Sequence, residues 1–200
     1  MKPTEACEHE ARETALTLIN NQAFYDLARP TIDTLAAKLA VVKFDATKAP
    51  AAFVNLINTG IRSHEWATVY GTWRPSVASR KLAAVEILDH YRDQICEKAA
   101  ELIGPEYMAV DVCEWAHDMS GNPTARHHVC TSTEDGGCVR LLTPRKVRRD
   151  QVGYGDRLDG CPGALRKAGF RPEWYELTGT TGDRSADSII ANYRRRPVTF

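Results

Sequence analysis

The chain has 200 residues and a mass of 22.3 kDa, which fits one ordinary domain or two small ones and excludes a large multidomain enzyme. Its 43% hydrophobic and 26% charged residues are typical of a globular protein and exclude wholesale disorder. The 26 basic and 26 acidic residues cancel, so neither a strongly basic nucleic-acid binder nor an acidic mimic of nucleic acid is indicated. Any charged partner would be recognised by a local patch.

The first half of the sequence predicts a succession of amphipathic helices. The three-to-four spacing of Leu16, Ile19, Ala23 and Leu27 predicts one helix over 4–28 with these residues on its inner face. Arg29–Pro30 interrupts this pattern, because proline disfavours helix at the residue before it. Further helices are predicted over 31–42, 46–58, 63–70 and 75–103.

Three residues predict where the shorter helices begin and end. Asp45 precedes the helix over 46–58, and Ser63 opens the helix over 63–70. Both side chains suit the N-cap position. Gly60, in the Asn58-Thr-Gly segment, is expected to end the helix between them. The longest helix is expected to turn Leu82, Val85, Leu88, Ile95 and Leu102 inward.

The pattern changes after Gly104–Pro105 to short strands separated by turn residues. Strands are predicted over 107–115, 125–132 and 138–143, then a short helix over 162–168, a strand over 173–178 and a helix over 185–193. We therefore predict an α+β protein, with a helical bundle in residues 1–104 and a small antiparallel β-rich domain in residues 105–200.

Residues 20–84 combine helix caps with regularly spaced apolar side chains. The most characteristic are Asn20–Asn21, Phe24–Tyr25, Arg29-Pro30-Thr31-Ile32, Leu35, Lys38, Phe44–Asp45, Ala49, Phe53-Val54-Asn55-Leu56, Tyr70 and Arg80. With them the stretch resembles a helical module of small uncharacterised phage and plasmid proteins, although Val41-Val42-Lys43 stands where that module usually has a glycine-containing turn. The resemblance implies a mobile-element accessory protein and no catalytic residue. Amphipathic helices also resemble one another because every helical core requires this spacing.

Four of the six cysteines lie between residues 113 and 161. The polar first residues do not resemble a secretion signal, and no apolar run is long enough to cross a membrane, so we expect a cytoplasmic protein of a bacterial host cell. Clustered cysteines there indicate metal ligands or reduced thiols rather than disulfides. Cys7 and Cys96 lie on predicted helices and are expected to be ordinary buried or half-buried thiols.

Thiolate and imidazole donors converging on one point would suit Zn²⁺. Two close pairs, Cys113 with His117 and His127 with Cys130, are separated by enough chain for a hairpin to bring them together. Cys138 is a further candidate ligand, and Cys161 another. The alternative is that these are ordinary strand cysteines with surface histidines, since His127 and His128 alternate along a strand.

A catalytic interpretation of the same region rests on the Ala125-Arg-His-His-Val129 segment and the Gly–Gly turn after Asp135. These residues resemble a His-Asn-His nuclease, which implies that His127 and His128 hold a divalent ion and activate water. Arg140 stands where that family has an asparagine, and no histidine follows His128. The resemblance therefore implies a degenerate copy of the nuclease.

A basic strip without acidic residues provides a candidate surface for nucleic acid or an acidic protein. It comprises Arg140, Arg145, Lys146, Arg148 and Arg149, with Arg194, Arg195 and Arg196 as a second cluster. Guanidinium groups match phosphate geometry, and Tyr154 and Tyr193 could stack on bases. The strip could equally be a solvated strand edge that deters aggregation.

These observations favour a non-enzymatic accessory or inhibitor protein that binds a host protein or nucleic acid. In this interpretation the second domain is stabilised by Zn²⁺ and the arginine clusters form the contact face. The alternative is a metal-dependent nuclease centred on His127 and His128. A third hypothesis is a helical interaction protein without metal.

Overall fold

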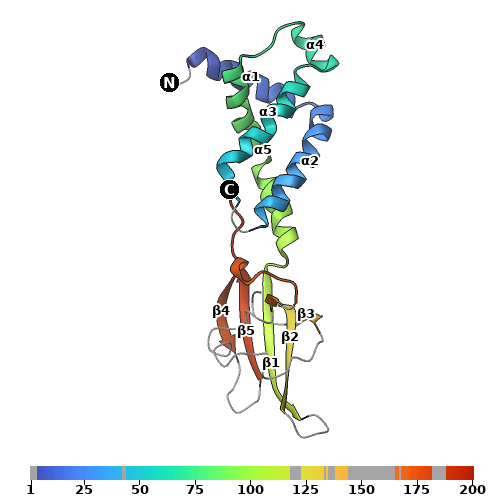
Figure 1. The fold of residues 1–200 in the computed structure, drawn as a ribbon, viewed down its shortest axis with the longest axis vertical. Helices are drawn as coiled ribbons and strands as arrows, with labels where there is room; N and C mark the ends of the chain where they lie inside the picture. Colours follow the sequence, from blue (N-terminus) through green and yellow to red (C-terminus); the bar gives the residue numbers. More distant parts are fainter. Residues whose placement is uncertain are drawn as a thin grey trace. The chain divides into compact units, whose positions relative to one another are not determined.

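The computed structural model describes residues 4–41, 44–117, 123–132, 134, 138–143, 165–166, 168–181 and 188–200. The chain forms two compact units, which are described separately (Figure 1). Unit 1 comprises Met1–Leu102 with Val198–Phe200 and is helical, and unit 2 comprises Ile103–Pro197 and holds a sheet. The predicted α+β class with a helical N-terminal part is confirmed. The division lies close to Gly104–Pro105, but the sequence did not predict that the last three residues belong to unit 1.

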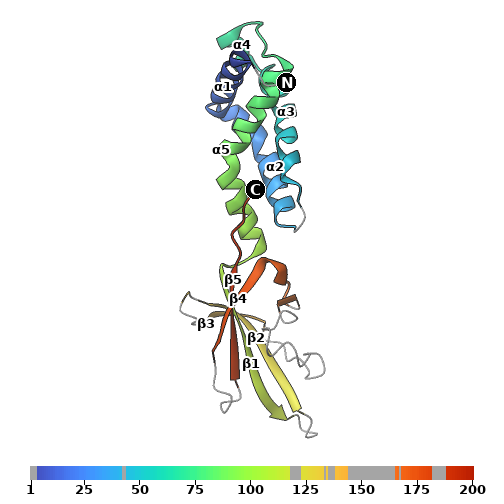
Figure 2. The ribbon, with the colours of Figure 1, turned by 90° about the vertical axis from the view of Figure 1, so that its left-hand side faces the viewer.

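The described residues of unit 1 form five α-helices. They are α1 (Glu5–Ile19), α2 (Gln22–Leu39), α3 (Ala49–Gly60), α4 (His64–Tyr70) and α5 (Val77–Ile103), with a 3₁₀ turn at Ala46–Lys48 before α3. The long α5 runs beside α2 and α3 (Figures 1 and 2). Between the helices lies one core that includes Phe24, Ile32, Phe53, Ile57, Trp66, Ile87, Tyr91 and Ile95. In the described ranges, none of the helices is both long and apolar enough to span a membrane.

The chain turns between α1 and α2 at Asn20–Asn21, so the prediction of one helix over 4–28 is wrong. Asn20 caps the end of α1 and donates from Nδ2 to the Leu16 carbonyl at 2.9 Å. Asn21 starts α2, because its Oδ1 accepts a hydrogen bond from Phe24 N at 3.1 Å. The two consecutive asparagines bind unpaired backbone groups at the end of α1 and at the start of α2. The spacing of apolar residues does not reveal such caps.

The break also changes which side chains face the core. Leu16 and Leu27, predicted to point inward, are 48% and 43% exposed. The core is instead built by smaller residues of α1 together with Phe24 and Ala28 of α2. The turn at Asn20–Asn21 separates two helices, so the apolar spacing of α1 does not continue into α2. The inner face predicted from one continuous helix is therefore misplaced.

Helix α2 continues through Pro30, where the sequence predicted an interruption. Proline removes one backbone donor from a helix and clashes with the preceding turn. Residues on both sides of Pro30, Ala28 before it and Ile32 and Leu35 after it, are buried in the same core. The packing of one continuous buried face of α2 therefore outweighs the free-energy cost of Pro30 within the helix.

The predicted helix caps agree with the structure, and the predicted inner face of the longest helix agrees in part. Ser63 caps α4 by accepting from Trp66 N at 3.2 Å, and Asp45 caps the 3₁₀ turn by accepting from Thr47 N at 3.2 Å. In α5, Leu88 and Ile95 are buried as predicted, whereas Val85 and Leu102 are exposed. Cys7 and Cys96 are half-buried free thiols, as expected.

Gly60, at the end of α3, is required by the close approach of α3 to α1 and α2. A Cβ atom there would lie 2.7 Å from Leu18 Cδ2 and 3.1 Å from Phe24 Cδ2. Leu18 and Phe24 are themselves buried, so neither side chain has room to move aside.

We predict that Gly60→Ala destabilises unit 1 by about 1–3 kcal/mol, the usual cost of overpacking a core. Urea unfolding followed by circular dichroism at the helix band measures this change. Gly179→Ala is the matched control, because a Cβ at Gly179 in unit 2 meets nothing within 4 Å. An unchanged midpoint for Gly60→Ala would contradict the packing described here.

The last residues of the chain pack on unit 1. Val198 and Phe200 lie against its core, and the Phe200 ring meets the Phe44 ring edge-on with centroids 6.0 Å apart. Cys96, on α5, is hydrogen-bonded to the Phe200 backbone. Burial raises the pKa of the Cys96 thiol, with a further contribution from Asp93, and the bond to Phe200 lowers it only in part.

We predict that Phe200→Ala increases the rate at which iodoacetamide alkylates Cys96 at pH 7.5 by about threefold or more, because the thiol loses cover and the thiolate is the reactive form. Mass spectrometry of the Cys96 peptide gives the rate. Thr199→Ala, at an exposed neighbouring residue, is the control and should leave it unchanged. Equal rates in both variants would show that Phe200 does not shield Cys96.

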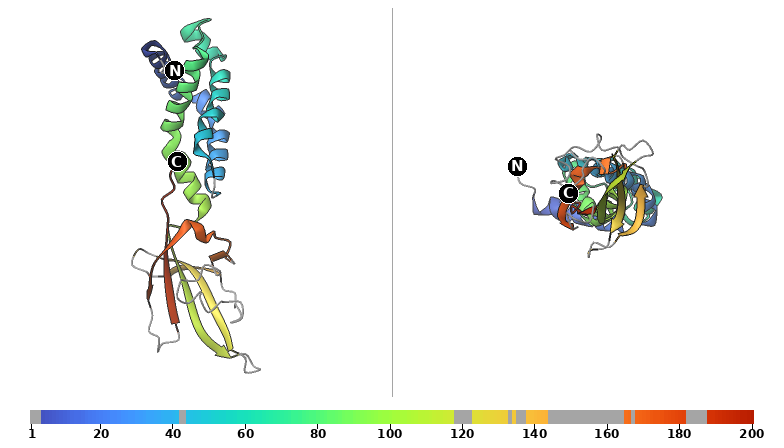
Figure 3. Two further views of the ribbon diagram at one scale, coloured as in Figure 1. Left: turned by 60° about the vertical axis from the view of Figure 1, so that its left-hand side comes forward. Right: turned by 90° about the horizontal axis from the view of Figure 1, so that it is seen from below.

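Unit 2 is built on a five-stranded antiparallel sheet of order β3-β2-β1-β5-β4. The strands are β1 (Tyr107–His117), β2 (Pro123–Ser132), β3 (Cys138–Thr143), β4 (Tyr175–Thr181) and β5 (Ser188–Arg195). β1 is paired with both β2 and β5 (Figure 3). The strands predicted over 107–115, 125–132 and 138–143 are confirmed. Of the helix predicted over 162–168, residues 162–164 and 167 lie outside the described part of the chain.

The helix predicted over 185–193 is wrong, because Ser188–Arg195 forms strand β5 between β1 and β4. Its two consecutive isoleucines, Ile189 and Ile190, are β-branched and favour strand. Ala191 and Tyr193 are both buried, which is the two-residue period of a strand. Pairing on both sides fixes this segment as a strand.

Candidate functional site

The start of α5 is capped from two directions. Ser76 precedes the helix, and its Oγ accepts a hydrogen bond from Ser79 N at 3.1 Å. In a capping box, a glutamate at the position of Ser79 would accept from the backbone N–H of Ser76 in return. Here Glu10 of α1 takes that place: its Oε2 accepts from Ser76 N at 3.2 Å and from the Ser79 hydroxyl. A residue of another helix thus completes the cap.

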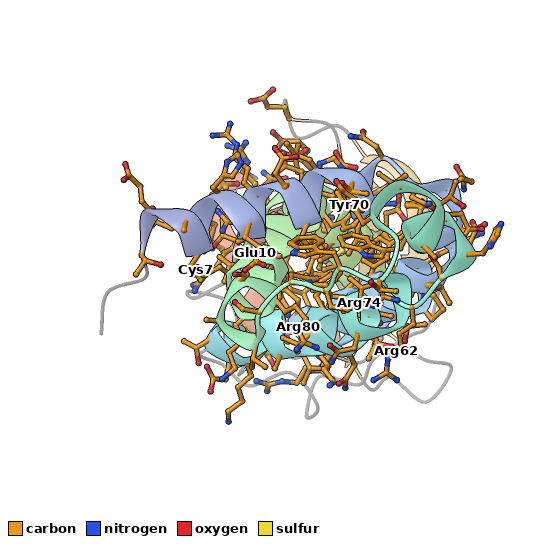
Figure 4. All side chains as sticks on the ribbon, turned by 90° about the horizontal axis from the view of Figure 1, so that it is seen from above. Cys7, Glu10, Arg62, Tyr70, Arg74 and Arg80 are labelled. Atoms are coloured by element: carbon orange, nitrogen blue, oxygen red, sulfur yellow. The ribbon has the colours of Figure 1, made fainter. Side chains whose placement is uncertain are left out.

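The hydroxyl and thiol groups around Glu10 form one connected network. Ser76 Oγ lies 2.7 Å from Ser79 Oγ, and Cys7 Sγ lies 3.2 Å from the same Ser79 oxygen. Ser79 is fully buried, so its hydroxyl requires these partners. Figure 4 shows Cys7 and Glu10 on the same side of α1, turned toward the segment that joins α4 to α5.

The network lowers the pKa of the Glu10 carboxyl. Burial on its own would raise the pKa of the Glu10 carboxyl, but the hydrogen bonds from Ser79 and Ser76 together outweigh it and hold the pKa below the ordinary value for glutamate. A carboxyl whose pKa is lower in the folded than in the unfolded state stabilises the fold above its unfolded pKa. That contribution is lost as the pH falls through the folded value.

We predict that Glu10→Gln destabilises unit 1 by about 1 kcal/mol at pH 7, the usual value of a helix cap. The difference between the wild type and the variant should shrink as the pH is lowered from 6 to 3, because protonation removes the charge in the wild type as well. Urea midpoints across this range measure it. Glu8→Gln, at an exposed position on the same helix, is the control. A difference that stays constant with pH would contradict the role of the carboxylate.

Three aromatic rings precede the cap along the chain. Trp66 and Tyr70 of α4 have ring centroids 4.5 Å apart, and Trp73 stacks on Trp66 at 5.8 Å with an interplanar angle of 13°. Trp66 Nε1 donates to the Trp73 carbonyl at 3.1 Å, and the Tyr70 hydroxyl lies 2.8 Å from Thr17 Oγ1. Trp66 is buried, whereas Trp73 is 41% exposed. Trp73 therefore presents a large aromatic surface to solvent on a rigid support.

An open pocket lies between this aromatic cluster and α1. It has a volume of about 630 Å³, within the usual range for ligand sites. Its walls are formed by Thr4, Ala6, Cys7, His9, Glu10, Glu13, Tyr70, Trp73 and Ser76. This pocket, which we call the α1–Trp73 pocket, is the candidate functional site. The sequence analysis did not single it out, and none of the predicted site residues belongs to it.

The predicted zinc ligands lie on three neighbouring strands. Cys113 and His117 are on β1, His127 and Cys130 on β2, and Cys138 on β3. The register pairs Val112 with His127 and Cys113 with Arg126, so Cys113 and His127 occupy neighbouring positions. The side chains of all five lie outside the described part of the structure, as do those of His128 and Arg140. The described side chains contain no group of three metal-ligating residues. The zinc and nuclease hypotheses remain predictions.

Of the predicted basic surface, the structure describes the side chains of the second cluster, Arg194 to Arg196. Arg145, Lys146, Arg148 and Arg149 lie outside the described residues. Arg194 pairs with Glu106 at 3.3 Å and lies 5.5 Å from the centre of the Tyr107 ring, and Arg195 donates to the Gly104 carbonyl. These two side chains make contacts within unit 2.

Arg196, which follows, is exposed, and its backbone N–H donates to the Trp174 carbonyl at 2.7 Å. Tyr193 was expected to be available for stacking on a base, but it is only 5% exposed. That expectation was wrong, because Tyr193 lies on the buried face of β5.

Comparison with known proteins gave no relatives: no family model, no curated protein and no solved structure matches this chain.

Proposed function

We propose that the chain is a non-enzymatic binding protein, of the accessory type carried by mobile elements, and that unit 1 holds a partner protein at the α1–Trp73 pocket. The mobile-element origin rests on the resemblance of residues 20–84 described above. The binding role is supported above all by Trp73, a half-exposed indole stacked on a buried one at the edge of an open pocket.

Tryptophan and tyrosine are enriched among the few residues that supply most of the free energy of protein–protein association. An aromatic side chain contributes most when it is ordered before binding, because little side-chain entropy is then lost. Trp73 meets this condition, since it packs on both Trp66 and Tyr70 and its carbonyl is held by Trp66 Nε1. The cluster has the properties of a prepared anchor.

The polar groups nearest the pocket support binding rather than turnover. Glu10 accepts hydrogen bonds from the start of α5, and the Ser79 hydroxyl is fully buried within the same network. A general base or nucleophile has to reach a substrate atom. Glu10 Oε2 and the Ser79 hydroxyl are instead engaged in the helix cap. The inhibitor or accessory role predicted from the sequence is compatible with such a surface.

We predict that a photo-crosslinking amino acid at His9, an exposed residue of the pocket wall, captures one protein from lysate of the host cells. The same probe at Glu101, in the last turn of α5, should not capture it. Mass spectrometry identifies the protein. With that protein purified, Trp73→Ala should weaken the dissociation constant about tenfold or more, as expected for a hot-spot tryptophan.

Trp73→Phe is the matched variant, since it keeps an aromatic ring and should weaken binding less. The urea midpoint of each variant shows whether unit 1 remains folded. Equal capture at His9 and Glu101, or affinity that does not depend on Trp73, would contradict the proposal. Capture of nucleic acid instead of protein at His9 would contradict it as well.

A further inference from the structure

We propose that the α1–Trp73 pocket takes the cationic end of an arginine or lysine side chain on the partner protein. This inference rests on the proposed function and names the chemistry that the pocket recognises. It combines the charge of one wall with the aromatic character of the other.

The α1 side of the pocket carries negative charge. Glu10 and Glu13 both line it, one helical turn apart on the same helix, and the described lining contains no lysine or arginine. The bonds from Ser76 and Ser79 are accepted by Oε2 of Glu10, and a carboxylate has further lone pairs on its second oxygen. Glu13 is exposed, so its carboxylate is accessible to a ligand. This wall attracts a cation and disfavours an anion.

The opposite wall is formed by Tyr70 and Trp73. The faces of aromatic rings carry partial negative charge, and tryptophan binds cations best among them. A flat guanidinium can stack on an indole and donate to a carboxylate at the same time. An ammonium group cannot stack, but it can interact with both as a compact charge. A pocket lined by both carboxylates and aromatic rings therefore suits a basic side chain.

Two arginines of the neighbouring segments donate to oxygen atoms of the chain itself. Arg74 donates to the carbonyls of Gly71 and Trp73, and Arg80 donates to Asn58 Oδ1 at 2.6 Å. Neither Arg74 nor Arg80 belongs to the lining of the pocket.

The test uses the whole protein and the tripeptide N-acetyl-Gly-Arg-Gly-amide at pH 8, where imidazole groups in general are neutral. The ¹⁵N-indole resonance of Trp73, assigned with Trp73→Phe, reports binding at millimolar peptide. We expect a saturable shift of this resonance. The same peptide with citrulline in place of arginine has nearly the same shape without the charge, and should bind at least about tenfold more weakly.

Glu13→Gln should weaken binding of the arginine peptide by about fivefold or more, since it removes a charge that faces the ligand. Glu8→Gln removes the same charge from an exposed residue of α1 outside the pocket and should have almost no effect. Equal binding of the citrulline peptide, equal effects of the two glutamate variants, or no saturable shift would each overturn the inference.

The two proposals fail separately. If crosslinking at His9 captures a partner that depends on Trp73 but the arginine peptide does not bind, the partner-binding function stands and its cationic ligand is wrong. If the peptide binds with the expected specificity and no protein is captured, the pocket recognises a cation but the proposed protein partner is wrong.

Discussion

The carboxylate of Glu10 completes the first turn of a helix to which it does not belong. By accepting hydrogen bonds from Ser76 and Ser79, it links α1 to the start of α5 and fixes the segment that carries Trp73. Hydrogen bonds to charged groups contribute about 1.5–3 kcal/mol, less where water reaches them. This one contact between distant parts of the chain therefore stabilises the helical unit and links α1 to the segment that carries Trp73.

Local signals in the sequence predicted much of the fold. Ser63 as the cap of α4, the long helix that ends at Ile103, and three strands separated by turn residues all depend on neighbouring residues. Such local signals do not predict secondary structure correctly where contacts between distant residues determine it. Pro30 lies inside α2 because one core buries both of its flanks, and Ser188–Arg195 is a strand because β1 and β4 pair with it.

The candidate pocket could not be predicted from sequence spacing. Glu10 and Ser79 are far apart in the chain and are brought together only by the packing of α1 against α5. The Trp66, Tyr70 and Trp73 spacing was the one available signal, since these residues fall within a short stretch rich in aromatics. The sequence analysis instead favoured cysteines, histidines and arginines of unit 2, whose chemistry is recognisable by residue type alone.

The order of the Trp73 side chain depends on the cap at the start of α5. Fluorine NMR of protein labelled with 5-fluorotryptophan tests this dependence most directly. We expect a single narrow Trp73 resonance in the wild type and a broadened or split one in Ser79→Ala, because loss of the hydroxyl loosens the wall. The Trp174 resonance, from unit 2, serves as the internal reference. A Trp73 resonance that is identical in the two proteins would contradict this dependence.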